Sequence, residues 1–305
     1  MTEEKKIFIS YRHSDAAWVR DTLYPVLSAG GAQVVVDYKD FDAGIALRKQ
    51  ISEKQATADV HLLVLTADYF TSDYCLEEMR RAVATDPQFE KGTVLPIVLQ
   101  QCALPPEIKG GGPLYVDLSG ARNLDAEGWG RVMKACGADL GMSPPHWLRA
   151  YLATRKALEE RRSVNLLVKG HPKWRELIDL LKLALPALGA VDLESGKTSK
   201  RRGLVAEILR EVAGYNGKIM AGQDLTDLER VLESKPPSLL ALRHFDKAAE
   251  RDYGSDLYSS LRYLIMEKRA LTLLVQSRAP FATLLPKNHA LSYLEMETVE
   301  LNGNT

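Results

Sequence analysis

The first half of the sequence predicts an α/β domain with a five-stranded parallel sheet. Short runs rich in β-branched residues alternate there with amphipathic segments, which is the pattern of a parallel sheet covered by helices on both faces. Two runs, Val34–Asp37 and Val94–Leu99, are apolar on both faces, as central parallel strands are. The chain has 305 residues, more than one typical domain, so a second module is expected.

Five strands and four helices are expected in this half. The strands are Ile7–Ser10, Gln33–Asp37, Val60–Thr66, Thr93–Leu99 and Leu114–Asp117. The helices are Asp15–Ala29, Gly44–Ala56, Ser72–Ala84 and Leu124–Asp139. The first helix begins behind a Ser and Asp capping signal and ends before two glycines, which supports its assignment.

The alternating pattern stops near Ser143, so we expect one domain over residues 1–142 and another over 143–305. The second half predicts a mostly helical domain, with an α+β arrangement as the alternative. Its helical segments are Leu148–Arg162, Trp174–Leu185, Leu204–Ala213, Leu225–Leu232, Ser238–Glu250 and Leu257–Lys268. Its weaker strand signals are Val164–Val168, Ala270–Val275 and Leu291–Leu301, and Ser195–Arg202 is interpreted as a loop or linker.

Composition excludes several classes of protein. Hydrophobic residues make up 46% of the chain and charged residues 26%, as in folded proteins rather than disordered ones. Forty Lys and Arg balance forty Asp and Glu, so no positive field attracts nucleic acid. The three cysteines share no close spacing, which predicts a reducing, cytoplasmic location. No uninterrupted apolar stretch predicts a signal peptide or a membrane span.

Polar and aromatic side chains follow the first three predicted strands. They lie in the segments Ser10–Asp15, Asp37–Gly44 and Thr66–Tyr74. Because parallel sheets bind ligands beyond the carboxyl ends of their strands, these segments are expected to meet at one binding edge. Their cation, hydroxyls, carboxylates and rings suit a ligand with phosphates, a ribose and flat rings.

Four strings in this half resemble, in order, the motifs of Toll/interleukin-1 receptor (TIR) domains. They are Ile7–Arg12, Asp37–Gly44, Tyr74–Met79 and Val94–Ile97. The resemblance covers Lys5 to Leu140, less than half of the chain. It implies a flavodoxin-like fold for this domain.

TIR domains divide into scaffolds that signal by assembling and enzymes that break the nicotinamide–ribose bond of NAD. In the enzymes that this chain resembles, the catalytic glutamate follows an aromatic residue by four positions, and here Glu78 follows Tyr74 in this way. Residues four apart lie on one helix face, so ring and carboxylate are expected to enter one cleft. The resemblance further implies that the substrate-binding residues are Ser10, Arg12, Phe41, Asp42 and Tyr74.

One carboxylate suffices for this reaction because nicotinamide leaves from a positively charged ring and needs no proton. An ionised Glu78 would hold the ribose hydroxyls and stabilise the positive charge that develops on the sugar. Phe41 and Asp42 would belong to a mobile loop that closes over the site, with Gly44 as its hinge. Many of the active enzymes have Trp where this chain has Tyr74, which predicts weaker substrate binding. Some of the active enzymes have a second Arg where this chain has His13, which also predicts weaker substrate binding.

Each of these residues also has an interpretation without chemistry. Glu78 would be a solvated surface charge, and Arg12 would pair with Asp15 or Asp37. Phe41 would be an interface residue, since an exposed aromatic ring on a loop serves either purpose. Tyr74 would pack against the neighbouring loop.

Other chemical motifs are incomplete. Gly196, Lys197 and Thr198 match the end of a phosphate-binding loop, but Val191 stands where the first glycine is required and no strand leads cleanly into the motif. The six histidines form no pair at metal-ligand spacing, so no metal site is expected. A hydrolase triad is not supported, because the sequence has no Gly-x-Ser-x-Gly elbow.

We therefore expect a cytoplasmic NAD glycohydrolase that either hydrolyses or cyclises its substrate and needs no cofactor. Self-association of TIR domains would activate it, and the C-terminal domain would respond to an activating ligand or partner. The resemblance to bacterial defence proteins implies a role against phage. The alternative functions are a non-catalytic TIR scaffold and a C-terminal receptor for a nucleotide messenger.

Overall fold

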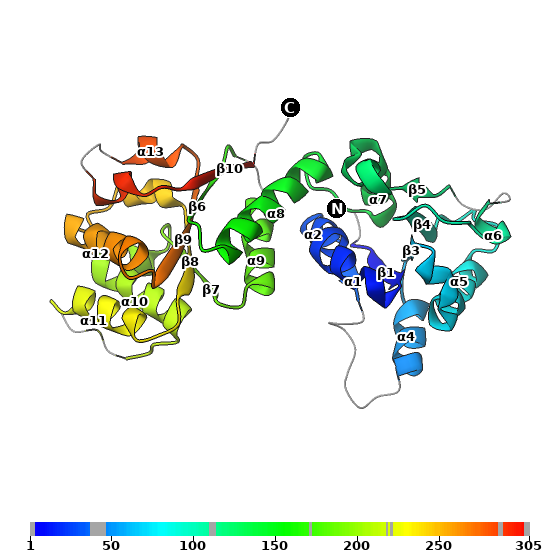
Figure 1. The fold of residues 1–305 in the computed structure, drawn as a ribbon, viewed down its shortest axis with the longest axis horizontal. Helices are drawn as coiled ribbons and strands as arrows, with labels where there is room; N and C mark the ends of the chain where they lie inside the picture. Colours follow the sequence, from blue (N-terminus) through cyan, green and yellow to red (C-terminus); the bar gives the residue numbers. More distant parts are fainter. Residues whose placement is uncertain are drawn as a thin grey trace. The chain divides into compact units, whose positions relative to one another are not determined.

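Two compact units, Met1–Leu148 and Arg149–Thr305, make up the chain in the computed structural model. The structure describes residues 4–36, 47–109, 114–170, 173–217, 219, 222–285 and 289–301. Each unit is built on its own five-stranded parallel sheet (Figure 1).

The sheet of the first unit has the strand order β2-β1-β3-β4-β5, and all of its neighbouring strands run parallel. Its strands are β1 (Lys6–Tyr11), β2 (Gln33–Val35), β3 (Val60–Leu65), β4 (Val94–Val98) and β5 (Val116–Asp117). β3 lies at the centre and is buried at every position, which explains why all of its residues except His61 are apolar. The predicted α/β fold with a five-stranded parallel sheet is confirmed.

The first unit has helices in each of the four predicted segments and a further short helix that was not predicted. They are α1 (Ala16–Trp18), α2 (Tyr24–Ala29), α4 (Leu47–Ala56), α5 (Asp73–Thr85), α6 (Pro106–Lys109) and α7 (Ala126–Cys136), with 3-10 turns at His13–Asp15, Asp68–Thr71 and Gly120–Leu124. The first predicted helix is interrupted by a π-helical stretch at Val19–Leu23, just before Pro25. Proline has no N–H for the regular helical hydrogen bond, which accounts for the local change in winding. The predicted strand end Asp37 and helix start Gly44 lie outside the described residues.

α5 is fixed on the sheet by its apolar face. Cys75, Met79 and Ala82 are buried in a cluster with Leu63 and Leu65 of β3. Leu76 and Val83 are partly buried against the same cluster. The apolar spacing of the sequence therefore sets the rotation of α5 about its axis.

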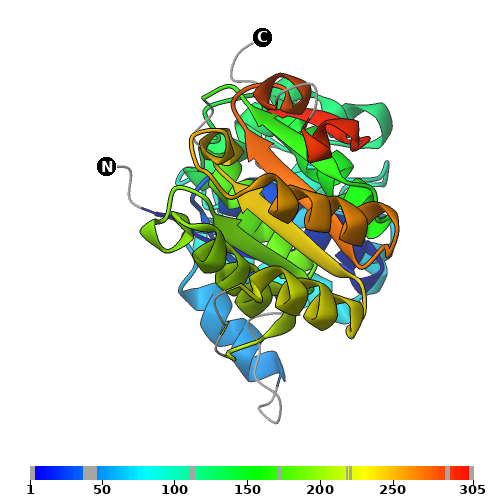
Figure 2. The same ribbon diagram turned by 90° about the vertical axis from the view of Figure 1, so that its left-hand side faces the viewer.

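The second unit has the strand order β10-β6-β9-β8-β7, again entirely parallel. Its strands are β6 (Val164–Val168), β7 (Leu188–Asp192), β8 (Ser238–Arg243), β9 (Leu271–Ser277) and β10 (Glu297–Leu301). Helix α8 (Pro144–Glu159) begins in the last residues of the first unit and continues into the second. The other helices of the second unit are α9 (Trp174–Ala184), α10 (Arg201–Ala213), α11 (Asp224–Glu233), α12 (Ser255–Met266) and α13 (Phe281–Leu284), with 3-10 turns at Gly196–Thr198, Phe245–Ala248 and Ala290–Tyr293. Figure 2 shows α10, α11 and α12 in front of the sheet, where they share one large core cluster with β7, β8 and β9.

Some expectations for the second half are wrong. The predicted helix Ser238–Glu250 is strand β8, which lies between β9 and β7, followed by a 3-10 turn. Its apolar run is Leu- and Ala-rich, without the β-branched residues that mark a strand, although both of its faces are buried. β7 was not predicted, and the predicted strand Leu291–Leu301 contains β10 only in its second half. The second unit is thus α/β, with a parallel sheet among the helices that were predicted for most of it.

Candidate active site

The carboxyl ends of β1 and β3 carry a buried set of hydroxyls. Ser10, at the end of β1, is 1% exposed, and Thr66 directly follows β3 with the same exposure. Thr66 Oγ1 donates a 3.0 Å hydrogen bond to Asp15 Oδ2 and accepts one of 3.2 Å from the Tyr69 N–H. Burial raises the pKa of Asp15, although the bond from Thr66 opposes this change. This edge of the sheet therefore contains buried polar side chains whose positions are fixed by hydrogen bonds.

Glu78 reaches this edge from the second turn of α5. The helix begins at the N-cap Ser72, whose hydroxyl accepts the Cys75 N–H at 3.4 Å. Three residues on from Cys75, the half-buried Glu78 turns its carboxylate toward the end of β1, where Oε2 accepts a 2.5 Å hydrogen bond from Ser10 Oγ. The carboxylate is thus oriented by a buried hydroxyl rather than spread into solvent.

Tyr69 lies beneath this pair, in the 3-10 turn between β3 and α5. Its ring is 0% exposed, and its hydroxyl lies 2.8 Å from Ser10 Oγ and donates to the Cys75 carbonyl at 3.0 Å. Burial raises the pKa of Tyr69 well above its ordinary value, so the phenol keeps its proton. Burial likewise raises the pKa of Cys75, which keeps this thiol protonated and unreactive.

Gln55 connects α4 to the helix that carries Glu78. Its Nε2 donates a 2.7 Å hydrogen bond to the backbone carbonyl of Glu78, and the residue is buried. Its Oε1 is buried without a hydrogen-bond partner in the structure. The contact fixes the backbone of α5 at the residue whose side chain meets Ser10.

The remaining predicted site residues are more exposed. Tyr74 is 47% exposed, one helical turn before Glu78 on α5. Arg12 is exposed just beyond β1, close enough for its positive charge to lower the pKa of Asp15, an effect smaller than that of burial. Phe41 and Asp42 lie outside the described residues. The structure therefore brings Ser10 and Glu78 into direct contact and leaves Arg12 and Tyr74 accessible to a ligand.

Comparison with known families concerns this first unit. A family model described as "TIR domain" matches residues 7–133. Residues 7–133 form a TIR domain. An uncharacterized protein, y4lF, of Sinorhizobium fredii is 35% identical over 100 residues, which are 32% of this chain and 30% of that protein. The match thus spans less than a third of the length of that relative.

Solved structures are similar to part of this chain. The TIR domain of the Toll-related receptor TRR-2 from Hydra magnipapillata is 18% identical, covers 43% of this chain and 97% of its own, and has a TM-score of 0.38. A Walker-type ATPase of Pyrococcus abyssi is 12% identical and covers 50% of this chain and 52% of its own, also with a TM-score of 0.38. The Orc1 protein of Aeropyrum pernix, solved in complex with DNA, is 16% identical over 50% of this chain and 44% of its own, with the same TM-score.

TIR domains commonly self-associate, and their family includes enzymes that cleave NAD. In this TIR domain the sequence motifs indicate Ser10 and Glu78, but they do not indicate Tyr69, whose hydroxyl lies 2.8 Å from Ser10 Oγ. Its position three residues after Thr66 at the end of a strand is the only signal that sequence reasoning could have used. In the part of the chain that the structure describes, no helix is long and apolar enough to span a bilayer, and no three His, Cys, Asp or Glu residues are grouped as metal ligands.

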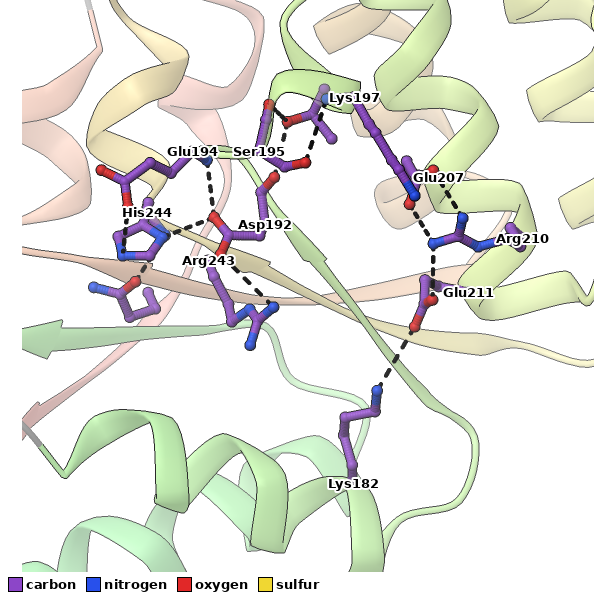
Figure 3. A network of polar contacts seen from close by, with 12 residues as sticks. Lys182, Asp192, Glu194, Ser195, Lys197, Glu207, Arg210, Glu211, Arg243 and His244 are labelled. Carbon is purple, nitrogen blue, oxygen red and sulfur yellow. Dashed lines mark hydrogen bonds and ion pairs between the residues drawn. The ribbon is translucent and has the colours of Figure 1, made fainter.

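A second polar network lies outside the TIR domain, at the carboxyl ends of β7 and β8 (Figure 3). His244 Nδ1 lies 2.8 Å from Asp192 Oδ1, and its Nε2 lies 3.6 Å from Glu194 Oε2. The backbone of His244 is left-handed, with φ 55°, and its N–H donates to Gln276 Oε1 at 2.7 Å. The Trp174 ring packs against the imidazole in a T-shaped arrangement, with the ring planes at 88°. These contacts tie α9 and three strand ends together.

The incomplete phosphate-loop motif has a structural role in this unit. Contrary to the sequence-based expectation, a strand does lead into it, since β7 ends four residues before Gly196. The loop nevertheless turns carbonyl oxygens inward, because the Arg251 guanidinium donates to the carbonyls of Glu194 and Ser195 at 3.4 and 3.3 Å. A phosphate-binding loop presents N–H groups instead. A Cβ on residue 203 would lie 2.0 Å from the Lys197 carbonyl oxygen. The loop therefore requires glycine at position 203 of α10.

Asp192 is expected to make the second unit less stable as the pH falls into the acid range. Burial alone would raise its pKa, but the Glu194 N–H and the His244 ring outweigh burial, and the pKa is lowered. Ionised Asp192 therefore stabilises the folded state above the ordinary Asp pKa, and this contribution is lost as pH falls through the lowered value. Urea unfolding of Asp192→Asn should show a deficit at pH 6 that shrinks toward pH 3. A deficit independent of pH would contradict this linkage.

Proposed function

We propose that this protein is an NAD glycohydrolase in which Glu78 is the catalytic residue. The proposal is supported most directly by the contact between Ser10 and Glu78, which orients a half-buried carboxylate at the carboxyl edge of a parallel sheet. Ligands of such sheets bind at this edge. The accessible Arg12 and Tyr74 nearby supply a cation for phosphates and a ring for stacking.

In the proposed reaction, the bond between C1′ of the ribose and N1 of nicotinamide breaks. Its electron pair goes to the ring nitrogen, so the positively charged ring leaves as neutral nicotinamide without a proton donor. The ribose becomes an oxocarbenium-like cation, and ionised Glu78 stabilises it through charge and through its bonds to the ribose hydroxyls. Water then gives ADP-ribose and a proton, whereas attack by an adenine nitrogen gives a cyclic product.

Control of this activity is assigned to assembly and to the second unit. An unrestrained NAD-cleaving enzyme would deplete its own cell, so the isolated chain is proposed to be nearly inactive. Self-association of TIR domains would complete the site, and an activating ligand or partner would act through residues 143–305. The proposed setting is the cytoplasm of a bacterium under phage attack, where NAD loss arrests growth.

The test is incubation of the purified full chain with NAD over a range of protein concentrations, with and without a crowding agent. Nicotinamide and the ribosyl product are separated by chromatography. We expect nicotinamide release to rise more steeply than in proportion to protein concentration, because assembly completes the site. The product peak distinguishes hydrolysis from cyclisation. Absence of nicotinamide release at every concentration and under crowding would contradict the proposal.

A non-catalytic scaffold is the second candidate. It is favoured by exposed apolar side chains next to the edge strand β5, where Leu114 is 72% exposed and Tyr115 42% exposed. Such a patch suits contact with another protein. If replacement of both residues by Ser abolished self-association while NAD was never consumed, this second function would be supported.

A further inference from the structure

A pocket of about 560 Å³ lies beyond the carboxyl ends of β8 and β9 in the second unit. Its walls come from residues 248–255, which lead from the 3-10 turn after β8 into α12, from α13, and from the side chains of Tyr258 and His289. Parallel α/β sheets bind ligands at this edge, and the volume is that of a site for a small organic molecule. We call this cavity the α12–α13 pocket.

Part of the pocket lining is apolar and buried. Tyr258 is 7% exposed and Leu285 is 8% exposed, and Leu284 packs against the same core cluster. The centroid of the His289 ring lies 4.3 Å from that of Tyr258, with the ring planes at 60°. Aromatic and branched aliphatic side chains offer a flat ring a large contact area. This part of the lining therefore suits the ring of a ligand.

His289 also supplies a hydrogen-bond donor to the pocket. Its Nδ1 accepts the Leu291 N–H at 3.2 Å, and burial lowers the pKa of the imidazole. The ring is therefore uncharged at neutral pH and, with Nδ1 as an acceptor, carries its single proton on Nε2. That N–H can bind an acceptor atom of the ligand, such as a heterocyclic nitrogen or a carbonyl oxygen.

Arg251 brings a positive charge to the wall of the pocket. Its Nη1 donates to the Ser195 carbonyl, Thr198 Oγ1 and the Tyr253 hydroxyl at 3.3, 3.1 and 3.3 Å, and its Nη2 donates to the Glu194 carbonyl at 3.4 Å. All of these acceptors are neutral, and among the described residues no carboxylate forms an ion pair with this half-buried guanidinium. Charges taken out of water are normally paired with an opposite charge. An anionic group on a ligand would provide that charge.

Asp252 is the other charged residue of the lining. It is exposed, and its Oδ1 accepts the Gly254 N–H at 3.1 Å. Asp256, in the first turn of α12, is already paired with Arg201. Water screens an exposed charge more strongly than a partly buried one. The N-terminus of α12, with Gly254 as its N-cap, adds a partial positive charge at the pocket, so the charge of Arg251 dominates there.

We propose that the α12–α13 pocket binds a small organic anion built on a flat ring, with the anionic group beside Arg251 and the ring against Tyr258 and Leu285. Phosphate and carboxylate groups share this chemistry, so a nucleotide and an aromatic acid are the two sources of such a ligand. Binding stands by itself. Its regulatory consequence, that this anion is the activating ligand of the second unit, rests on the proposed NAD glycohydrolase.

Thr283→Trp is expected to close the pocket. Thr283 lines the pocket from α13 and is exposed, so the larger ring can fill the pocket without entering the core. Ala282→Trp is the matched control, because Ala282 precedes Thr283 on the same helix and is exposed but does not line the pocket. Thr283→Trp should weaken ligand binding at least about tenfold, the cost of losing the contacts of one ring, whereas the control should bind like the wild type.

Arg251→Gln tests the charge of the pocket. Glutamine keeps an N–H donor near the carbonyls of Glu194 and Ser195 but removes the positive charge. Binding of an anion should weaken about tenfold, and binding of an uncharged analogue should not change. If the melting curve shows that Arg251→Gln is not folded, Thr283→Trp alone decides.

The direct test is isothermal titration calorimetry of the full chain with AMP and with indole-3-carboxylate, and with adenosine and indole as their uncharged analogues. We expect at least one anion to bind with a Kd below about 1 mM and its analogue to bind at least about tenfold more weakly. Binding of AMP alone identifies a phosphate as the anionic group, and binding of indole-3-carboxylate alone identifies a carboxylate. Binding of neither anion, or binding that Thr283→Trp leaves unchanged, would overturn the proposed site.

Nicotinamide release separates the pocket from the proposed function. With both correct, the bound anion raises the release by the wild type and by Ala282→Trp but not by Thr283→Trp. If the anion binds and no variant cleaves NAD, the pocket holds and the NAD glycohydrolase proposal fails. If NAD is cleaved and no anion binds, the proposed function holds and the pocket fails. If the anion binds without changing the rate of NAD cleavage, its role as the activating ligand is overturned.

Discussion

Glu78→Gln is expected to lower the rate of nicotinamide release about 10²–10³-fold, the usual cost of removing one group that stabilises transition-state charge. The amide has the shape of the carboxylate, and its oxygen still accepts from Ser10 Oγ, so the local packing is kept. What it lacks is the negative charge opposite the ribose cation. The measurement is the initial rate of nicotinamide release at saturating NAD, followed by chromatography.

Glu77→Gln provides the matched control for this loss. Glu77 precedes Glu78 on α5, is equally half-buried, and pairs with Arg81 on the same helix. Its replacement removes the same charge one position away from Ser10, so the rate should stay within about twofold of the wild type, as is usual when a surface pair worth only tenths of a kcal/mol is lost. Equal rates in wild type and Glu78→Gln would exclude Glu78 as the catalytic group. Equal losses in both variants would point to a general effect of charge on α5.

Sequence spacing predicted which residues of the TIR domain come close to one edge, but not how they are joined. Alternation of strands and helices places Ser10 and Glu78 near the carboxyl ends of β1 and β3, because every parallel strand delivers its following loop to that edge. The contact of Ser10 with Tyr69 depends on the winding of a 3-10 turn, which has no periodicity in the sequence. Tyr69 could therefore be predicted as a core residue but not as a partner of Ser10.

The two sheets differ in how well their strands could be predicted. β3 contains valines and is flanked by polar residues at both ends, so its composition predicts a strand. β8 is equally buried, but its residues Leu239 to Leu242 are Leu and Ala, which favour helices when taken locally. Its strand state is imposed by pairing with β7 and β9 on both sides. Pairing with neighbouring strands therefore determines the strand conformation of β8, and the local sequence of this segment does not predict it.

The largest effect on stability is expected at Asn165, a polar residue at the second position of β6 that is 0% exposed. Its Nδ2 donates to Ser277 Oγ at 2.7 Å and to the Val275 carbonyl at 3.3 Å, while its Oδ1 accepts the Phe281 N–H at 3.1 Å. One side chain thus satisfies the end of β9 and the first residue of α13. Asn165→Ala removes all three bonds and leaves the Phe281 N–H buried without this partner.

Asn165→Ala is expected to lower the free energy of unfolding of the second unit by about 2–5 kcal/mol, since each unsatisfied buried polar group costs about 1–3 kcal/mol. Urea unfolding combined with hydrogen-exchange mass spectrometry of peptides from β6 and β9 measures this loss in the second unit alone. The control is Thr298→Ala, because Thr298 faces Asn165 in the register of β10 with β6 but is exposed. If both variants exchange at the wild-type rate, the side chain of Asn165 is not what holds β9 and α13 to β6. If only Asn165→Ala exchanges faster, a single buried amide fixes the edge of the sheet from which α13 begins.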